Sequence, residues 1–293
     1  MANVNGISAS ESLRRYLSRE AKSHLEIIDV DTLEVTEAAY FDYLIEAPNW
    51  LSDGRLLYNS GGLIYTIDLK TGGIKRIETG ECDLSNNDHV VSSDGRTLCI
   101  SGGSPSRIYA LPIEGGAPRL VTPHGPSYLH GISPDGSMIA YTATRDGGPM
   151  KIYTMPLAGG AETKLTDGPG LDDGPEYSPD GQHIWFNSVR SGLMQLYRMK
   201  TDGSQVTRMT DSGRNDWFAH ISPDGKRCAY LSYGTDIDPK DHPDKKDVEL
   251  RIMDADGQNG RTLLKLFGGQ GTINVNSWSP DSRKIAYVRY ERQ

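Results

Sequence analysis

A short turn motif recurs six times along the chain and constrains its fold more than any other feature. Each copy reads Ser-Pro-Asp-Gly or a close variant, and the copies are marked by Asp53, Asp94, Asp135, Asp180, Asp224 and Asp281. The intervals between these aspartates are 41, 41, 45, 44 and 57 residues. Proline presets φ at the second turn position, aspartate can hold its own backbone, and glycine accepts positive φ at the fourth position. Because apolar segments flank every copy, each copy predicts a β-hairpin, and a period of about 40–45 residues is typical of a four-stranded propeller blade.

A second predicted hairpin follows most copies of the motif. It is marked by an apolar residue before tyrosine, at Ile64-Tyr65, Ile108-Tyr109, Ile152-Tyr153 and Leu196-Tyr197, with weaker copies from Leu25 and Leu250. The chain begins with a second hairpin, residues 24–36, and ends with a first hairpin, residues 273–290. Since these halves complete each other, we predict an all-β fold, a six-bladed β-propeller of four-stranded blades. A two-plus-two clasp of N-terminal and C-terminal strands closes its ring.

The predicted propeller domain covers residues 24–293 and follows an N-terminal extension of residues 1–23. In that extension, Ser8 and Glu11 have the spacing of a capping box, which predicts a short helix over about residues 11–19. The extension has no apolar segment typical of a secretory signal. We therefore expect a cytoplasmic protein, or a periplasmic one if the natural chain begins earlier with a leader.

Composition narrows the classes of function. Lysine and arginine number 31 against 39 aspartates and glutamates, a net charge of −8, which argues against nucleic acid as a partner. The sequence contains no run of 18 apolar residues, so it predicts no segment that spans a membrane. The three cysteines, Cys82, Cys99 and Cys228, are too few and uneven for a disulfide framework. Cys99 and Cys228 lie in apolar segments, where we expect them to be buried.

The repeat resembles that of the TolB-like propellers, the WD40-like PD40 repeat. Its fullest copy is Pro175-Glu176-Tyr177-Ser178-Pro179-Asp180-Gly181, which continues to Gln195-Leu196-Tyr197, and the similarity covers about residues 24–290. The resemblance implies a propeller that binds a protein partner, as TolB proper does, but without the N-terminal domain of TolB, because only 23 residues precede the first strand. Prolyl-oligopeptidase-type enzymes share such blades, yet this chain has no Gly-x-Ser-x-Gly motif.

The loops that lead into the inner strands are the predicted binding surface. Propellers commonly bind ligands at a mouth of the central channel, and these loops all lie at one mouth, which we call the loop-side mouth. They are rich in carboxylates, histidines and aromatic rings, a mixture suited to a cation, a sugar or a peptide. The candidate binding residues are Asn87, Asp88, His89, Tyr128, His130, Asp172, Asp173, Glu176, Asp216, Trp217 and His220. The alternative for each residue is an ordinary solvated loop position.

Three of these residues are candidate metal ligands. His89 and His130 both lie five residues before a turn aspartate, and His220 lies four before one. Equivalent positions on neighbouring blades would bring them close enough to hold a divalent cation. The alternative, which we favour, is that each histidine hydrogen-bonds a neighbouring blade. We therefore predict no cofactor and keep a divalent cation as an open possibility.

An acidic insertion lengthens the last interval. Residues 235–249, which we call the flap, lack the calcium-loop pattern of an EF-hand and are expected to cover the mouth. Trp50, Tyr177 and Trp278 share one repeat position and are expected to pack between blades.

Three functions are open to such a propeller. The favoured hypothesis is a non-enzymatic protein that binds a protein, peptide or small ligand at the loop-side mouth, because the sequence shows no catalytic motif. The alternative is a metal-dependent lyase or hydrolase that acts on an acidic sugar, similar to the oligogalacturonate lyases, which requires the three histidines around one ion. The third is a structural hub, which predicts an apolar patch on the outer surface. The sequence leaves the oligomeric state open.

Overall fold

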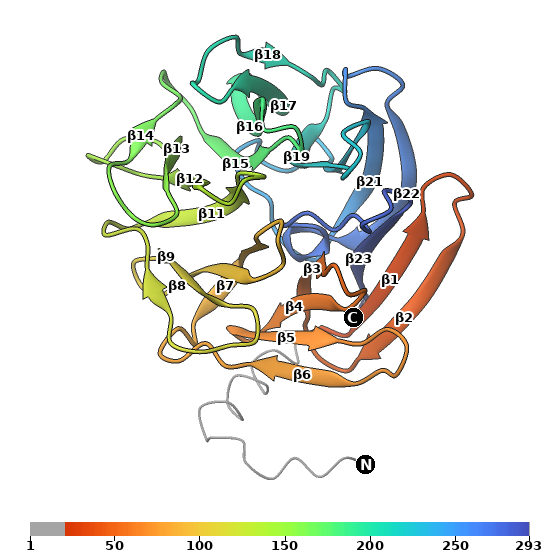
Figure 1. Ribbon diagram of the computed structural model, residues 1–293. Coiled ribbons are helices and arrows are strands. Elements are labelled where there is room, and N and C mark those ends of the chain that lie inside the picture. Colours follow the sequence, from red (N-terminus) through yellow and green to blue (C-terminus); the bar gives the residue numbers. More distant parts are fainter. Residues whose placement is uncertain (1–20, 293) are drawn as a thin grey trace.

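The structure is a computed structural model that describes residues 21–292, and these residues form a ring of six β-sheets around a central channel (Figure 1). Five blades have four antiparallel strands each, ordered from the channel outward. The first blade is β3(Glu46–Trp50), β4(Leu56–Ser60), β5(Leu63–Ile67) and β6(Ile74–Ile77), and the second is β7(Ser85–Val91), β8(Thr97–Gly102), β9(Arg107–Pro112) and β10(Arg119–Leu120). The third is β11(Ser127–Ile132), β12(Met138–Ala143), β13(Lys151–Pro156) and β14(Thr163–Lys164). The fourth is β15(Asp172–Tyr177), β16(His183–Ser191), β17(Leu193–Lys200) and β18(Thr207–Arg208), and the fifth is β19(Asn215–Ile221), β20(Arg227–Tyr233), β21(Lys246–Asp254) and β22(Arg261–Gly268).

The sixth sheet, the closing blade, joins the two ends of the chain. N-terminal β1(Ser23–Asp29) pairs with β2(Val35–Phe41) on one side and with C-terminal β23(Lys284–Tyr290) on the other. The innermost segment, which follows a 3-10 turn at Gln270–Thr272, contributes a single bridge from Trp278 to Ile285. Within this segment, the Asn276 Oδ1 accepts a hydrogen bond from the Trp278 N–H at 3.1 Å. The predicted two-plus-two clasp is therefore confirmed, with an inner strand reduced to a bridged segment.

The turn motifs adopt the predicted geometry. In the third blade, Asp135 Oδ1 accepts hydrogen bonds from the Ser133 hydroxyl and the Ser137 N–H, at 2.5 and 3.0 Å. The glycine after each of the first five turn aspartates has positive φ, for example 72° at Gly136. In the sixth copy, Ser282 takes the same conformation, with φ of 60°. Its hydroxyl accepts a hydrogen bond from the Asp224 N–H of the neighbouring blade, which helps to offset the strain.

The core lies between the blades rather than inside any one of them. Buried apolar side chains form six clusters in the described residues, one at each blade interface. Alternate residues of one strand serve opposite interfaces: Ile139 and Tyr141 face the second blade, while Ala140 faces the fourth. This alternation is the period of two that the strands show in sequence. Each blade is therefore fully buried only when it has one neighbouring blade on each of its two faces.

Several other predictions concern burial. Cys82, Cys99 and Cys228 are free thiols and all are buried. Tyr177 and Trp278 lie in interblade clusters, and Trp50 packs against another, as expected. No helix within residues 21–292 is long and apolar enough to span a bilayer. The short helix expected over residues 11–19 lies outside the described residues.

Candidate functional site

The inner strands bend where they leave the loop-side mouth. Register shifts interrupt the pairing of all five inner strands, including β15 between Asp173 and Glu176 and β19 between Trp217 and His220. Such bulges place two residues opposite one and turn side chains out of the regular alternation. In β19 the bulged residue Phe218 has φ of 60°, and its N–H donates to Asn187 Oδ1 of the fourth blade at 2.9 Å. Bonds between blades therefore fix the shape of the mouth.

A cavity of about 260 Å³ lies at this mouth, and we call it the mouth cavity. It is lined by Asn86, Asp88, Tyr128, His130, Met150, Asp173, Phe218, His242, Gln270 and Asn274. These residues come from several blades and from the flap. Since most of the ring contributes, the cavity exists only in the closed propeller.

Four titratable side chains meet in the mouth cavity. His130 Nε2 lies 3.4 Å from Asp173 Oδ1 and 3.9 Å from Asp88 Oδ1. On the far side of Asp173, its Oδ2 lies 3.9 Å from Nε2 of His242. The side chain of His130 is only 8% exposed, and those of Asp88 and Asp173 are 6% and 11% exposed. The flap thus adds a second imidazole to a buried group of two carboxylates and one imidazole.

Burial and the neighbouring charges shift the pKa values of these side chains in opposite directions. Burial raises the pKa of Asp88. Burial also disfavours the charged form of Asp173, but the hydrogen bond and charge of His130 outweigh it and lower the pKa of Asp173 to about 2. For His130, burial opposes protonation, yet the carboxylates of Asp88 and Asp173 raise its pKa overall. Asp173 is therefore held in its ionised form, and the two carboxylates favour the protonated form of His130.

Two further cavities adjoin the mouth cavity, and Asn86 lines all three. In the larger one, of about 550 Å³, the Asn87 amide donates to Glu46 Oε1 at 3.1 Å, and Asn59 donates to Asn87 Oδ1 at 2.9 Å. Desolvation by the protein raises the pKa of Glu46 to about 7. Glu46 is therefore a third carboxyl group at the mouth, and its charge changes near neutral pH.

The structure brings only some of the predicted residues together. Asp88, Tyr128, His130 and Asp173 line the mouth cavity, and Asn87 lines its neighbour. Asp172 is buried against Lys151, with Oδ2 2.9 Å from Nζ. Asp216 accepts from the Ser232 hydroxyl at 2.6 Å, and Trp217 is fully buried, with its ring 4.4 Å from that of His242. Asp172, Asp216 and Trp217 are therefore buried and do not line the mouth cavity.

The three candidate metal ligands do not share one site. His89 Nε2 lies 2.8 Å from the Ala47 carbonyl oxygen of the first blade, and burial lowers its pKa to about 4. His220 contacts Glu176 Oε2 at 2.7 Å through Nδ1 and the Ile273 carbonyl oxygen at 2.5 Å through Nε2. His130 alone of the three lines the mouth cavity. The geometry of His89 and His220 is that of blade-to-blade hydrogen bonds, the favoured alternative.

Another group in the described residues has the spacing of a metal site. His24, Glu26 and Glu37 offer ligand atoms that lie within 4.8 Å of one another on β1 and β2. His24 Nδ1 is 2.6 Å from Glu37 Oε2, and Glu26 Oε1 accepts from Arg289 at 2.7 Å. Each group therefore already has a protein partner at the outer part of the closing blade.

Sequence reasoning missed several residues of the mouth. Glu46 and Asn274 lie on the approach to the channel in the first and closing blades, so the loop argument could have included them. His242 shares no repeat position with the other histidines, although it lies in the flap, which is expected to cover the mouth. Phe218 gave no signal, since its exposure to the cavity depends on the bulge in β19.

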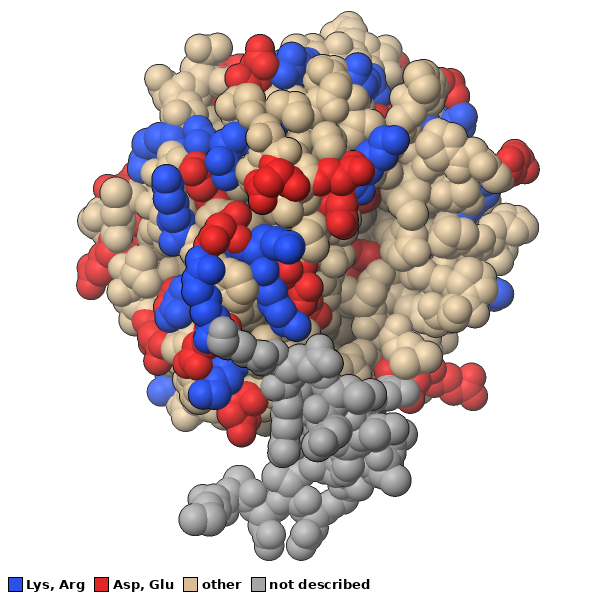
Figure 2. Space-filling model, turned by 180° about the vertical axis from the view of Figure 1, so that it is seen from behind, with Lys and Arg blue, Asp and Glu red and all other residues tan. Residues whose placement is uncertain are grey.

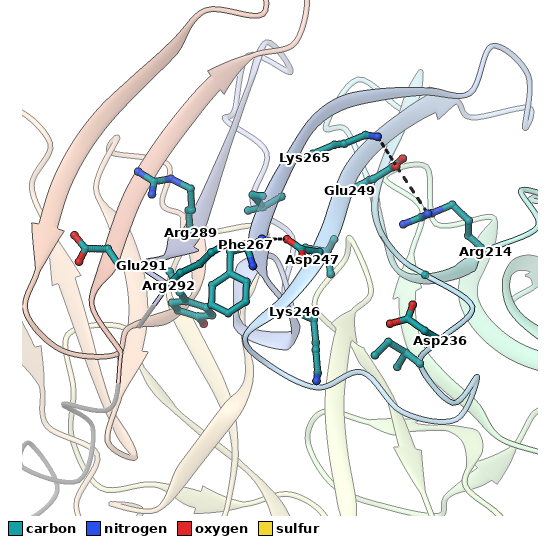
Figure 3. A pocket seen from close by; sticks show the side chains of 15 residues that line it. Arg214, Asp236, Lys246, Asp247, Glu249, Lys265, Phe267, Arg289, Glu291 and Arg292 are labelled. Atoms are coloured by element: carbon teal, nitrogen blue, oxygen red, sulfur yellow. Dashed lines mark hydrogen bonds and ion pairs between the residues drawn. The ribbon is translucent and has the colours of Figure 1, made fainter.

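Two other cavities were not predicted. At the opposite, turn-side mouth, Trp50, Tyr177 and Trp278 help to line a cavity of about 410 Å³, which His130 also reaches. A cavity of about 980 Å³ lies between the fifth and closing blades (Figure 3). Charged side chains gather mainly on one side of the face seen in Figure 2. Within the 980 Å³ cavity, Arg292 pairs with Asp247 and Lys265 lies 3.6 Å from Glu249, so much of its charge is neutralised locally.

Comparisons with known proteins agree with this architecture. The model of the TolB β-propeller domain family matches residues 131–241. The uncharacterised protein Atu1656 of Agrobacterium fabrum is 47% identical over 274 residues, which is 92% of each chain. A solved structure of a candidate TolB from Agrobacterium tumefaciens is 46% identical, with a TM-score of 0.90 over 94% of this chain and all of that one.

More distant structures share the fold alone. TolB from Acinetobacter baumannii is 18% identical, with a TM-score of 0.59 over 94% of this chain and 65% of its own. An oligogalacturonate lyase in complex with manganese is 14% identical, with a TM-score of 0.53 over 76% of this chain and 66% of its own. With the near relatives and the six-bladed ring together, the chain belongs to the TolB-like β-propeller family.

Proposed function

We propose that this protein is a non-enzymatic binding propeller whose loop-side mouth takes up a small ligand or a peptide segment of a partner protein. The observation that carries this proposal is the mouth cavity, in which Asp88, His130 and Asp173 are buried with imidazole-to-carboxylate distances of 3.4 and 3.9 Å. Charged groups kept in a concave, partly apolar pocket are a common feature of binding sites.

Both carboxylates of the mouth cavity approach the same imidazole nitrogen, Nε2 of His130, and neither His89 nor His220 lines that cavity. The alternative function, a metal-dependent lyase, gains no support from His89 and His220, which contact backbone carbonyl oxygens.

A methionine methyl group offers a direct test. Met150 lines the mouth cavity, whereas Met209 and Met253 lie in an interblade cluster and serve as internal controls. With methyl-labelled methionine, amino-acid amides and tripeptides of acidic, basic, aromatic and neutral type are titrated by NMR. We expect at least one class to shift the Met150 signal and leave Met209 and Met253 unchanged.

Two tryptophan variants locate the binding surface. Asn86→Trp fills the junction of the three mouth cavities, and Ser93→Trp makes the same kind of change at the turn-side cavity. We expect Asn86→Trp to abolish the Met150 shift and Ser93→Trp to preserve it. The opposite pattern, or no response of Met150 to any probe, would overturn the proposal.

A further inference from the structure

The carboxylates of the mouth cavity make only long contacts with its imidazoles. The closest imidazole contacts of its carboxylates are 3.4 and 3.9 Å, whereas charge-assisted N–H···O bonds are typically about 2.7–2.9 Å. Asp173 Oδ1 accepts from the Gly174 N–H at 2.7 Å, and its Oδ2 lies 3.9 Å from Nε2 of His242. Because an ionised carboxylate has about four lone-pair sites, Asp173 can accept further hydrogen bonds.

A second, independent acceptor lies beside the carboxylates. Asn274 is 1% exposed, and its Nδ2 donates to Asp88 Oδ1 at 2.8 Å. A carboxylate only accepts, so this bond fixes the orientation of the amide. The Oδ1 of Asn274 is buried and has no hydrogen-bond partner among the described residues. A buried acceptor left in this state costs free energy that a ligand N–H would recover.

The charge and the walls of the cavity narrow the ligand further. Among the described residues that line it there is no lysine or arginine, and its charged groups are two carboxylates, Asp88 and Asp173, with the imidazoles of His130 and His242. Tyr128 and Phe218 supply aromatic surface and Met150 supplies a thioether. Aromatic rings and carboxylates together favour an organic cation over an anion. A volume of about 260 Å³ fits one alkyl chain with its charged end.

We propose that the mouth cavity binds a primary ammonium group, with Asp173, Asp88 and Asn274 as acceptors for its three N–H donors. This inference rests on the proposed function and names the ligand chemistry of the same site. A primary ammonium has three donors and no acceptor, which matches the three acceptors of the cavity. The two oxygens of Asp88 already accept from the amides of Asn86 and Asn274, and a carboxylate has lone pairs left for a further N–H donor. The ammonium could belong to a lysine side chain or to a free amine.

The test measures binding of matched probes to the whole protein by calorimetry and by the Met150 methyl signal. Pentylamine represents a free amine, and N-acetyl-lysine methylamide represents a lysine within a peptide. Pentanol, pentanoate and N-acetyl-norleucine methylamide have similar size without the positive charge. Pentyltrimethylammonium keeps the charge but has no N–H. We expect at least one amine to bind about tenfold or more tightly than all four controls, because one charge-assisted hydrogen bond is worth roughly that factor.

Two variants assign the site. Asp173→Asn keeps the shape and removes the charge, and we expect it to weaken amine binding about tenfold or more. Asp236→Asn makes the same change on the flap outside the mouth cavity and is expected to leave binding unchanged. Thermal unfolding checks that both variants fold, and the trimethylammonium comparison on the unmodified protein remains decisive if Asp173→Asn does not.

The outcomes separate the two proposals. Tighter binding of the lysine derivative than of pentylamine identifies a peptide source, and the reverse identifies a free amine. If pentanol, pentanoate or the trimethylammonium probe shifts Met150 as strongly as the amines, the ammonium assignment is wrong while the mouth remains a binding site. If the amines do not shift the Met150 signal but amino-acid amides of another class do, the ammonium assignment is likewise wrong and the mouth remains a binding site. If nothing shifts Met150, both proposals fail.

Discussion

At the scale of single residues, the turn motif combines two demands that few residues satisfy together. The aspartate must accept hydrogen bonds from its own turn, and the next residue must adopt positive φ. Glycine meets the second demand without steric cost, which explains its place in five of the six copies. Ser282 meets it only with the help of an interblade hydrogen bond. The residues of the repeated motif are therefore those that suit the backbone conformation of the turn.

Replacing one turn glycine tests this account. At Gly136, φ is 72° and an added Cβ would meet nothing within 4 Å, so Gly136→Ala introduces backbone strain without a clash. We expect the free energy of unfolding to fall by about 1–2 kcal/mol, measured by urea denaturation. Gly148→Ala, at an exposed glycine without positive φ, is the control and should change stability by only a few tenths of a kcal/mol. Equal losses in both variants would refute the role given to φ.

Glu46 makes stability depend on pH. Its pKa is about 7 in the folded protein and near 4.5 in the unfolded chain, so the folded state holds the proton more tightly. Stability from this group is therefore full at acid pH and is lost as pH rises from about 4.5 through 7. We expect Glu46→Gln to be more stable than wild type by about 2–3 kcal/mol at pH 8 and equally stable near pH 4.5.

Urea unfolding at both pH values measures this difference. Glu78→Gln changes a carboxyl group that is 72% exposed and serves as the control. Its stability should track that of wild type across the range. A constant gap between Glu46→Gln and wild type at all pH values would contradict the linkage.

At the scale of elements, buried polar groups tie strands of different blades together. Lys151 of β13 is 3% exposed and its Nζ donates to Asp172 of β15 and to the Gly170 carbonyl oxygen, each at 2.9 Å. The Ser188 hydroxyl of β16 donates to the other oxygen of Asp172 at 2.5 Å. The third and fourth blades are thus joined by a buried ion pair as well as by apolar packing. This explains why Asp172 does not line the mouth cavity.

Breaking this pair from one side should be costly. Lys151→Met leaves the buried Asp172 carboxylate with Arg190, 3.1 Å away, as its remaining cation, and we expect a loss of about 3 kcal/mol in the free energy of unfolding. The double variant Lys151→Met, Asp172→Asn removes the buried negative charge and should recover part of that loss. The exposed pair Lys164–Asp167 is the control, and Lys164→Met should cost less than about 1 kcal/mol. A double variant less stable than Lys151→Met would rule out this explanation.

At the scale of the whole molecule, the clasp makes the ring one cooperative unit. Val288 of β23 is fully buried between the closing and first blades and pairs with Leu25 of β1. Because every blade is covered on both faces by its neighbours, opening one interface exposes two faces and removes the constraint on the rest. Stability is therefore shared around the ring rather than stored in separate blades.

A charge at the clasp tests this cooperativity. Val288→Asp buries an unpaired carboxylate and should destabilise the protein by about 4 kcal/mol or more, with loss of hydrogen-exchange protection in β15 and β16 of the fourth blade. Val35→Asp, on the exposed side of β2, is the matched control and should leave that protection intact. Full protection of β15 and β16 in Val288→Asp would show that the blades unfold independently.

The sequence alone determined the repeat, the blades, their number and the way in which the ring closes. These features are local or periodic: a turn motif specifies its own hairpin, alternation specifies two buried faces, and the complementary halves at the two ends specify the clasp. The sequence also placed Asp88, Tyr128, His130 and Asp173 at the mouth, because they lie near one end of repeated strands.

Only the tertiary structure decided which side chains face the cavity. His89 and His130 share a position in the repeat, yet His130 lies within the bulge of β11, whereas His89 follows the bulge of β7 and is paired with Ile100. The bulges depend on bonds from neighbouring blades, such as that from Phe218 to Asn187. His242 reaches the mouth through an insertion that has no counterpart in the repeat. Side-chain direction at the mouth is thus set by contacts between blades, which the periodicity of one chain segment does not encode.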